Sequence, residues 1–220
     1  MNIRAIIRRQ HTRYKFIASL AQDVVVLDIG AGNGLMQMKL SEYRQHIRFI
    51  SVDKYDYSGD YPPDTFFQVD VTSETLPIDA ETIDAVFCSH VLEHLISYEL
   101  LILEIRRVLK PGGKLYFESP GLRSVFLPSL KMGQGRDVPL NFYDDPTHIK
   151  PYTEQALYLL ARKMGFKKIK TGKARNWIYA ILSPVLICLS LLSCNRKMLA
   201  LAVWNAIGWC NYLWAEELGK

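Results

Sequence analysis

The stretch Val24–Gly34, VVVLDIGAGNG, decides the fold of this chain. Its first half is a run of apolar, mostly β-branched residues that favours a buried strand, and three glycines follow at once. Glycine lets the backbone turn tightly and approach a ligand closely. The helical periodicity of residues 35–43 puts a helix N-terminus behind the turn, where polar groups of a ligand can bind. A strand, a glycine turn and a helix in this order predict a nucleotide-like cofactor site in an α/β fold.

The spacing of the glycines argues against a dinucleotide. The NAD fingerprint G-x-G-x-x-G places its third glycine three positions after the second, whereas Gly34 comes two positions after Gly32. An NAD-dependent oxidoreductase is therefore the less favoured alternative. At the end of the next predicted strand, Asp53 is positioned to accept hydrogen bonds from the hydroxyls of a ribose.

Strand and helix patterns alternate along most of the chain and predict one domain over residues 1–220. Repeated strand–helix–strand units require right-handed crossovers, so we expect an α/β, Rossmann-like, seven-stranded and mostly parallel sheet with helices on both faces. The predicted strands are 24–29, 48–53, 65–71, 85–89, 114–119, 166–171 and 209–216, and the main helices are 35–43, 98–109 and 153–164. The remaining parts are an N-terminal helix within 1–22, a cofactor-binding core at 23–120, a substrate-side loop at 121–152 and an apolar helical hairpin at 177–207, inserted before the last strand.

Five ordered pieces of this sequence resemble the class I S-adenosylmethionine-dependent methyltransferases, specifically their small-molecule group. They are LDIGAGNG (27–34), Asp53, QVDV (68–71), IDAVFCSHVLEHL (83–95) and LKPGGKLYFESP (109–120). The resemblance implies S-adenosyl-L-methionine as the cofactor. It also implies that the cofactor-binding residues are Asp28, Gly30, Gly32, Asp53, Asp70, Val71 and Ser89, and that His90 lines the pocket near the sulfonium. Lys54 departs from the family, many members of which have an apolar residue beneath the adenine.

The predicted catalytic residue is His148, in the segment DDPTH (144–148) of the substrate-side loop. Histidine accepts protons near neutral pH, and a nearby carboxylate could orient it, so His148 is the candidate general base. The alternative is that Asp144 and His148 only fix the loop. Residues 90–94 match the zinc-peptidase motif H-x-x-E-H, but that motif needs a continuous helix and a third ligand, so we expect no metal site.

Charge and cysteine content indicate where the protein acts. Up to Glu154 the chain has 17 basic and 20 acidic residues, whereas residues 155–215 have nine basic residues and no acid. This basic region runs into the uncharged stretches 177–194 and 198–215 and lacks the basic and aromatic interleaving of a nucleic-acid groove. It favours an anionic membrane surface as partner, with a homodimer contact or packing over the sheet as alternatives for the hairpin. The four cysteines, in apolar surroundings and without C-x-x-C spacing, predict buried thiols in a reducing compartment.

These observations predict a cytoplasmic enzyme, peripheral at the inner face of the membrane. We expect methyl transfer to a small or lipid-linked acceptor, on oxygen rather than on carbon or nitrogen. A non-catalytic nucleotide-binding module is the alternative. The sequence does not identify the acceptor.

Overall fold

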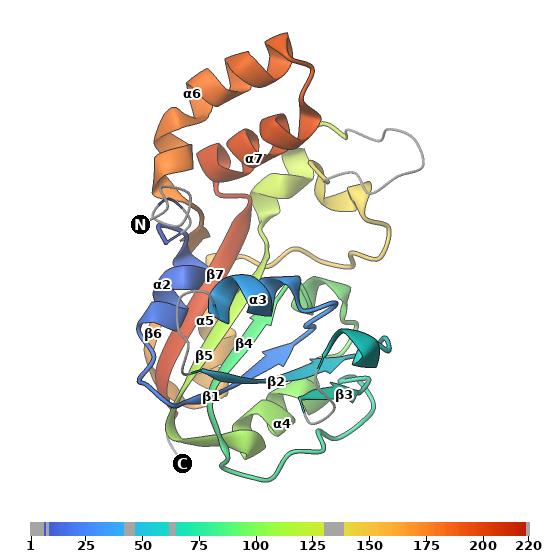
Figure 1. The fold of residues 1–220 in the computed structure, drawn as a ribbon, viewed down its shortest axis with the longest axis vertical. Helices are drawn as coiled ribbons and strands as arrows, with labels where there is room; N and C mark the ends of the chain where they lie inside the picture. Colours follow the sequence, from blue (N-terminus) through green and yellow to red (C-terminus); the bar gives the residue numbers. More distant parts are fainter. Residues whose placement is uncertain (1–6, 8, 42–46, 62–64, 130–138, 219–220) are drawn as a thin grey trace.

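A seven-stranded sheet forms the centre of the molecule, as predicted (Figure 1). The structure is a computed structural model that describes residues 7, 9–41, 47–61, 65–129 and 139–218. The strand order is β3-β2-β1-β4-β5-β7-β6, and only β7 runs antiparallel to its neighbours. The strands are β1 (Val25–Ile29), β2 (Arg48–Asp53), β3 (Phe66–Gln68), β4 (Ile83–Ser89), β5 (Leu109–Pro120), β6 (Phe166–Ala174) and β7 (Cys210–Leu218).

Helices cover both faces of the sheet, because the central strands are apolar on both sides. On one face, α2 (Thr12–Ala18) and α3 (Leu35–Ser41) pack through Phe16 and Leu40 against Val26 and Tyr116. On the other face, α4 (Glu99–Val108) and α5 (Glu154–Lys163) belong to a core that contains Leu27. Successive residues of β1 therefore point to opposite layers, as the pleat requires.

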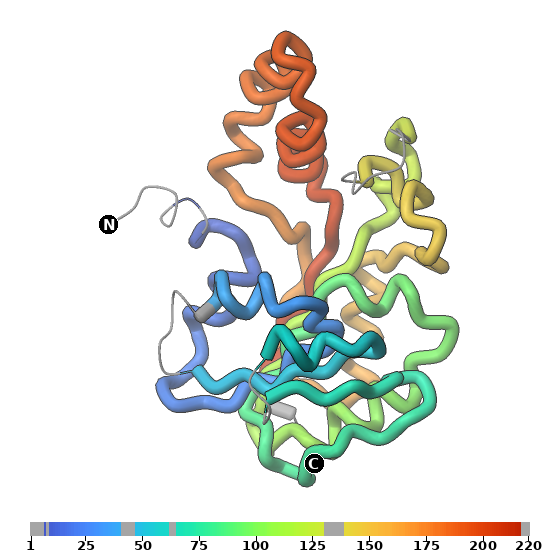
Figure 2. The backbone as a smooth tube through the Cα atoms, turned by 45° about the vertical axis from the view of Figure 1, so that its right-hand side comes forward, coloured from blue at the N-terminus to red at the C-terminus, as the bar shows by residue number. Residues whose placement is uncertain are grey.

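The predicted apolar hairpin consists of α6 (Trp177–Leu192) and α7 (Arg196–Ile207), which connect β6 to β7. It extends beyond the carboxyl ends of the parallel strands, on the same side as residues 121–129 and 139–152 (Figure 2). Asn176 and Asn195 cap the N-termini of the two helices with their side chains, and α7 ends at Gly208 with φ +65°. None of the helices in the described part of the chain is long and apolar enough to cross a membrane.

Three sequence expectations need correction. Pro184, which was expected to break the apolar hairpin, lies inside α6 without ending that helix. Cys88 and Cys210 are buried thiols, but Cys188 and Cys194 are exposed, because the hairpin stands clear of the sheet. The third strand ends at Gln68, so the adjacent Asp70 lies in the following turn.

A buried ion pair joins the N-terminal helix to the sheet. Arg13 of α2 donates to the carboxylate of Glu118 in β5, which also accepts a hydrogen bond from the Tyr116 hydroxyl at 2.6 Å. Burial opposes ionisation of Glu118, but the Arg13 guanidinium, together with weaker contributions that include the Tyr116 hydrogen bond, outweighs that effect and lowers the pKa of Glu118 to about 2.

Removing one partner of this pair would leave an uncompensated buried charge. We expect Arg13→Met to lower the free energy of unfolding by about 3–5 kcal/mol at pH 7, measured by urea denaturation. Arg106→Met, on the exposed face of α4, is the matched control and should change it by less than about 0.5 kcal/mol. Because the pKa of Glu118 is lowered in the folded state, the stability it contributes is present above about pH 4.5 and lost as the pH falls toward 2. If the two substitutions changed the free energy of unfolding equally, the Arg13–Glu118 pair would contribute nothing specific to stability.

Candidate functional site

The glycine loop between β1 and α3 is held against the next strand. The backbone N–H groups of Gly30 and Ala31 donate to the carbonyl of Val52, at 2.8 and 3.2 Å. Gly30 has φ +72°, and a Cβ there would lie 2.2 Å from Val91 Cγ2, so no larger residue fits. Gly32 has φ +52°, and a Cβ on it would point into open space. The loop therefore has one side packed against the protein and one side free for a ligand.

Asp53 at the end of β2 reaches this loop. Its Oδ2 accepts a hydrogen bond from the Gly32 backbone N–H at 2.8 Å, and its Oδ1 accepts one from the Tyr55 N–H at 3.0 Å. Asp28, in β1, is buried, and its Oδ2 has no partner among the described residues. Burial, together with the neighbouring Asp53, raises the pKa of Asp28 to about 8, although a hydrogen bond from Gln37 acts the other way.

Asp70 follows β3 and forms an ion pair with Lys54. The Lys54 Nζ lies 2.9 Å from its Oδ2, and the Thr72 hydroxyl donates to its Oδ1 at 2.6 Å. The hydrogen bond from Thr72 and then the one from Lys54 lower the pKa of Asp70 to about 2. This contact explains the polar residue at position 54: Lys54 pairs with the predicted adenine-binding carboxylate. Val71, beside Asp70, packs partly against the core.

Ser89 and His90 mark the end of β4. The Ser89 hydroxyl is buried without a partner in the described structure, and His90 has φ +60°. The His90 Nδ1 lies 3.1 Å from Glu93 Oε1, and its Nε2 lies 3.8 Å from the Cys210 sulfur and 3.9 Å from Glu118 Oε1. Burial opposes protonation of His90, but the Cys210 sulfur and the Glu93 carboxylate raise its pKa well above the ordinary value.

These residues suit the cofactor that the sequence predicts. A polar ligand beside Gly32 would find the open side of the loop, the Asp53 carboxylate, and two buried oxygens that lack partners, Asp28 Oδ2 and Ser89 Oγ. Gly30, Asp70 and Val71 lie on adjoining loops at the same edge of the sheet. The assignment of each of these residues to a part of the cofactor stays a prediction.

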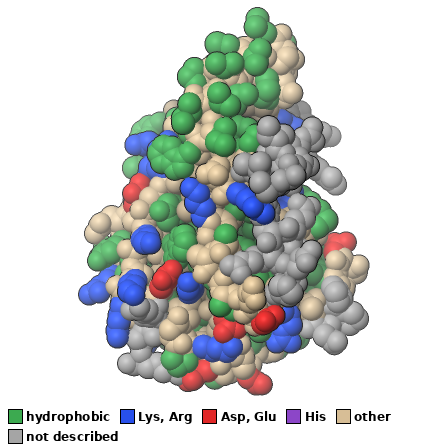
Figure 3. Space-filling model, turned by 60° about the vertical axis from the view of Figure 1, so that its left-hand side comes forward, with side chains coloured by type: hydrophobic (Ala, Val, Ile, Leu, Met, Phe, Trp, Pro, Cys, Tyr) green, Lys and Arg blue, Asp and Glu red, His purple; other side chains and the backbone are tan. Residues whose placement is uncertain are grey.

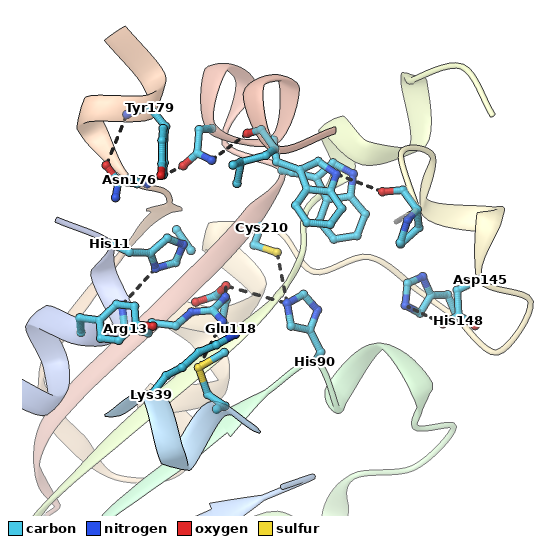
Figure 4. Close-up of a pocket in the computed structure, with 18 of the residues that line it drawn as sticks. His11, Arg13, Lys39, His90, Glu118, Asp145, His148, Asn176, Tyr179 and Cys210 are labelled. Atoms are coloured by element: carbon cyan, nitrogen blue, oxygen red, sulfur yellow. Dashed lines mark hydrogen bonds and ion pairs between the residues drawn. The ribbon is translucent and has the colours of Figure 1, made fainter. Parts of the chain in front are cut away.

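A cavity of about 590 Å³ lies next to this region, between the end of the sheet and the hairpin (Figure 4). Because the predicted substrate-side loop reaches it through His148, we call it the acceptor cavity. His90 and His148 both line it, whereas none of the seven predicted cofactor-binding residues does. The other lining residues are His11, Arg13, Tyr14, Met36, Lys39, His94, Glu118, Pro139, Asp145, Ala174, Asn176, Tyr179, Leu201, Trp204, Asn205, Trp209 and Cys210.

His148 is held at the cavity in a defined orientation. Its side chain is 5% exposed, its Nδ1 lies 2.7 Å from the Phe142 carbonyl, and its Nε2 lies 3.9 Å from Asp145 Oδ2. Because a carbonyl only accepts, Nδ1 carries the proton and Nε2 keeps its lone pair in the neutral ring. The carboxylate near the ring is that of Asp145, whereas Asp144 accepts from the Leu140 and Asn141 N–H groups and fixes the loop.

The segment that matches H-x-x-E-H forms only a three-residue 3-10 helix, Leu92–His94, so it lacks the continuous helix of a zinc peptidase. His94 Nδ1 lies 2.8 Å from the Thr147 hydroxyl and thereby anchors the loop that carries His148. Glu93, His94 and His148 each offer one potential ligand atom within 4.8 Å of the other two. The expected absence of a metal stays a prediction.

Sequence reasoning missed the residues that the N-terminal helix and the hairpin contribute to the cavity. Arg13 comes from α2, Trp204 from α7, and Trp209 and Cys210 from the segment that follows the hairpin; Lys39 of α3 was missed as well. One signal for Arg13 was present: Glu118 stands in the apolar strand KLYFES, and a buried carboxylate requires a cation partner.

Comparison with known proteins identifies the family. A profile described as "Methyltransferase domain" matches residues 4–171. The mitochondrial ubiquinone biosynthesis O-methyltransferase of Rattus norvegicus is 35% identical over 100 residues, which are 41% of this chain and 29% of the rat protein. A probable S-adenosylmethionine-dependent methyltransferase of Mycolicibacterium smegmatis is 28% identical over 163 residues, which are 73% of this chain and 58% of that protein. The matches thus span between about a third and three fifths of these relatives.

Solved structures share the fold at low sequence identity. The methyltransferase described in complex with the Haloferax volcanii Trm112 methyltransferase activator has a TM-score of 0.70 at 15% identity, covering 96% of this chain and 91% of that one. A SAM-dependent methyltransferase from Archaeoglobus fulgidus has a TM-score of 0.60 at 20% identity, covering 97% and 93%. The profile matches most of the chain, and the sheet order, the glycine loop and the shared fold agree with that match. The chain therefore belongs to the class I S-adenosylmethionine-dependent methyltransferase family.

Proposed function

We propose that this protein transfers a methyl group from S-adenosylmethionine to an oxygen atom of a small or lipid-linked acceptor bound in the acceptor cavity. The observation that carries the proposal is the position of this cavity. It begins at His90, the residue after Ser89, where the predicted cofactor site ends. An acceptor in the cavity would therefore approach the cofactor from the side of β4.

The residues around the cavity have three tasks. The cofactor, when bound, supplies a methyl group already activated by a sulfonium, so acceleration depends mainly on aligning the acceptor and excluding water. Leu201 and Trp204 of α7 line the cavity with apolar surface, which supports the exclusion of water. His148 accepts the hydroxyl proton of the acceptor at Nε2, and the adjacent Asp145 carboxylate stabilises the imidazolium that results.

Oxygen as the methylated atom is supported by a base at the cavity and by two relatives. A hydroxyl is poorly acidic, so its methylation benefits from a positioned proton acceptor. The ubiquinone biosynthesis proteins of Rattus norvegicus and Coxiella burnetii are both named O-methyltransferases. The Coxiella protein is 25% identical over 99 residues, which are 43% of this chain and 42% of that protein.

The outer face of the hairpin supports a site of action at a membrane. Ile181 is 76% exposed and Leu192 is 84% exposed, and Figure 3 shows apolar side chains gathered over the protruding hairpin. Arg196 and Lys197 lie at its tip, beside Leu192, and residues 155–215 contain no acid. An apolar surface with flanking cations fits an anionic leaflet. The exposed large apolar residues of α6 are Trp177, Ile181, Leu182, Val185, Leu189, Leu191 and Leu192.

The proposed location is therefore cytoplasmic and peripheral, at the inner face of the membrane. The hairpin enters one leaflet without spanning it. The lysines of β6 lie along the edge strand that runs up to the base of the hairpin, whereas Arg196 and Lys197 lie at its tip, so the tip residues would make the nearer electrostatic contact (Figure 1). A homodimer formed through α6 is the competing explanation of the same surface, and a vesicle assay separates the two.

The first prediction concerns the cofactor. S-adenosylhomocysteine should raise the melting temperature, because a ligand that binds only the native state stabilises it by about 2.7 kcal/mol at 100 times its Kd. Asp53→Ala should remove most of that increase, since it deletes both the carboxylate and its hydrogen bond to Gly32. Asp56→Ala, at an exposed carboxylate on the same connection, should leave it intact. A response to NADH and none to S-adenosylhomocysteine would refute the proposal.

The second prediction concerns His148. With methyl-labelled cofactor and a fractionated cell extract as the source of acceptor, His148→Ala should lower turnover by about 10² to 10⁴-fold and leave S-adenosylhomocysteine binding unchanged. His148→Asn keeps a donor for the Phe142 carbonyl but supplies no base, so it should be equally inactive and better folded. Full activity of His148→Asn would reduce His148 to a structural residue. Cofactor binding without label transfer into any fraction, at wild-type His148, would favour a non-catalytic binding module.

The third prediction concerns the membrane. The protein should float with vesicles that contain anionic lipid, and added salt should weaken this binding without abolishing it, because screening removes only the electrostatic part. Leu191→Ser with Leu192→Ser should weaken binding to anionic and neutral vesicles alike, whereas Arg196→Gln with Lys197→Gln should weaken only the anionic case. A chain that ignores vesicles and elutes as a dimer would contradict membrane binding and support the homodimer.

A further inference from the structure

The acceptor cavity has two chemically different sides, and this division limits what can bind there. Tyr179, Leu201, Trp204 and Trp209 form the apolar side, contributed by the hairpin and the residue before β7. The cationic side is formed by residues of α2 and α3 (Figure 4). At about 590 Å³ the cavity has room for a ligand of ordinary metabolite size.

The apolar side offers ring faces rather than hydrogen bonds. The Trp204 indole N–H donates to the Pro139 carbonyl at 3.0 Å, and the Trp209 N–H donates to the Leu140 carbonyl at 2.7 Å. The two rings lie 5.1 Å apart between centroids. Because both donors are already satisfied within the protein, these rings favour an apolar or aromatic part of a ligand.

The cationic side holds more positive charge than its acids neutralise. The Glu118 carboxylate pairs with Arg13 and also accepts the Tyr116 hydroxyl. A second guanidinium nitrogen of Arg13, Nη1, donates to the Met36 sulfur at 3.8 Å and makes no ion pair with a carboxylate of the described residues. Lys39 is half-buried at the cavity and, among the described residues, has no carboxylate within ion-pair distance.

The other acid at the cavity lies on the far side of His90 and cannot serve Lys39. Asp145 accepts hydrogen bonds from the Thr147 N–H and hydroxyl at 2.9 and 2.6 Å and faces His148. Figure 4 shows Arg13, Lys39 and Glu118 on one side of His90, with Asp145 and His148 on the other. An anionic group that entered near Lys39 would therefore meet two cations and one already paired carboxylate.

We infer that the acceptor is amphipathic and anionic: a carboxylate or phosphate group binds beside Lys39 and Arg13, and an aromatic or other apolar body packs on Trp204 and Trp209. This inference rests on the proposed function, since it assumes that the cavity receives the acceptor. It assigns Lys39 and Arg13 to specificity rather than to the transfer step. It also separates the recognition of the acid group, near α2 and α3, from the proton acceptor His148.

Three naphthalene probes of one shape test the inference: 2-naphthoate, 2-naphthyl phosphate and the neutral 2-naphthamide. Their binding to the full chain is measured by titration calorimetry in the presence of S-adenosylhomocysteine. At least one anion should bind about tenfold or more tightly than the amide, as expected for a charge-assisted hydrogen bond. The tighter of the two anions identifies the acid group as carboxylate or phosphate.

Two variants and one control locate the preference for an anion within the cavity. Lys39→Gln should reduce the advantage of the anions to about twofold or less, whereas Lys163→Gln, an identical change on exposed α5, should leave it unchanged. Trp204→Ala should weaken all three probes equally, because it removes apolar surface on which the naphthalene body common to all three would pack. An anion preference that survives Lys39→Gln, or amide binding as tight as that of both anions, overturns the inference. If S-adenosylhomocysteine binds and the preference is absent, only the inference fails; if S-adenosylhomocysteine itself does not bind, the proposed function fails.

Discussion

The close approach of two loops at the centre of the sheet is the constraint on which the site depends. A Cβ at Gly30 would lie 2.2 Å from Val91 Cγ2, so the turn after β1 and the turn after β4 are in contact at that point. Each turn also contains one residue with left-handed backbone: Gly30 has φ +72° and His90 has φ +60°. The first turn forms the open side beside Gly32, and the second directs His90 toward the acceptor cavity. Any larger residue at position 30 would move both turns and so affect both halves of the site.

The gathering of the predicted cofactor-binding residues at one edge of the sheet could be predicted from sequence because its determinants are local. The glycines, Asp53, Ser89 and Asp70 lie at the ends of apolar strands or just after them, and parallel strands bring their carboxyl ends to one edge. The seventh strand and the position of the hairpin before it were predictable for another reason: the family resemblance implies a seven-stranded sheet, and only 209–216 remained to complete it. The interior Pro184 and the exposed Cys188 and Cys194 were mispredicted, because local composition does not show that a hairpin protrudes.

The acceptor half could not be predicted because it depends on contacts between distant segments. Arg13 and Glu118 are 105 residues apart, and Trp204 donates to a carbonyl 65 residues earlier. Hydrophobic periodicity gives the face that a helix buries but not which polar residue at the rim of that face meets a partner strand. His148 was identifiable as a candidate by its residue type, whereas its tautomer became evident only from the Phe142 carbonyl.

The N-terminal helix and the hairpin are also tied to each other at the rim of the cavity. The Asn176 side chain, which caps α6, donates to the Ile7 carbonyl at 2.6 Å, and His11 forms a bridge with Asn176. His11 is itself kept neutral, because burial, assisted by the nearby Arg13 charge, lowers its pKa to about 4. A neutral histidine at this junction avoids placing a further cation beside Arg13. A displacement of α6, such as insertion into a leaflet would produce, would thus be transmitted through Asn176 to the segment that begins α2. Because α2 supplies Arg13 and α7 supplies Trp204, the two sides of the acceptor cavity would respond together, whereas the hydrogen bonds of Gly30, Ala31 and Asp53 within the described structure join neighbouring loops and strands and not these helices.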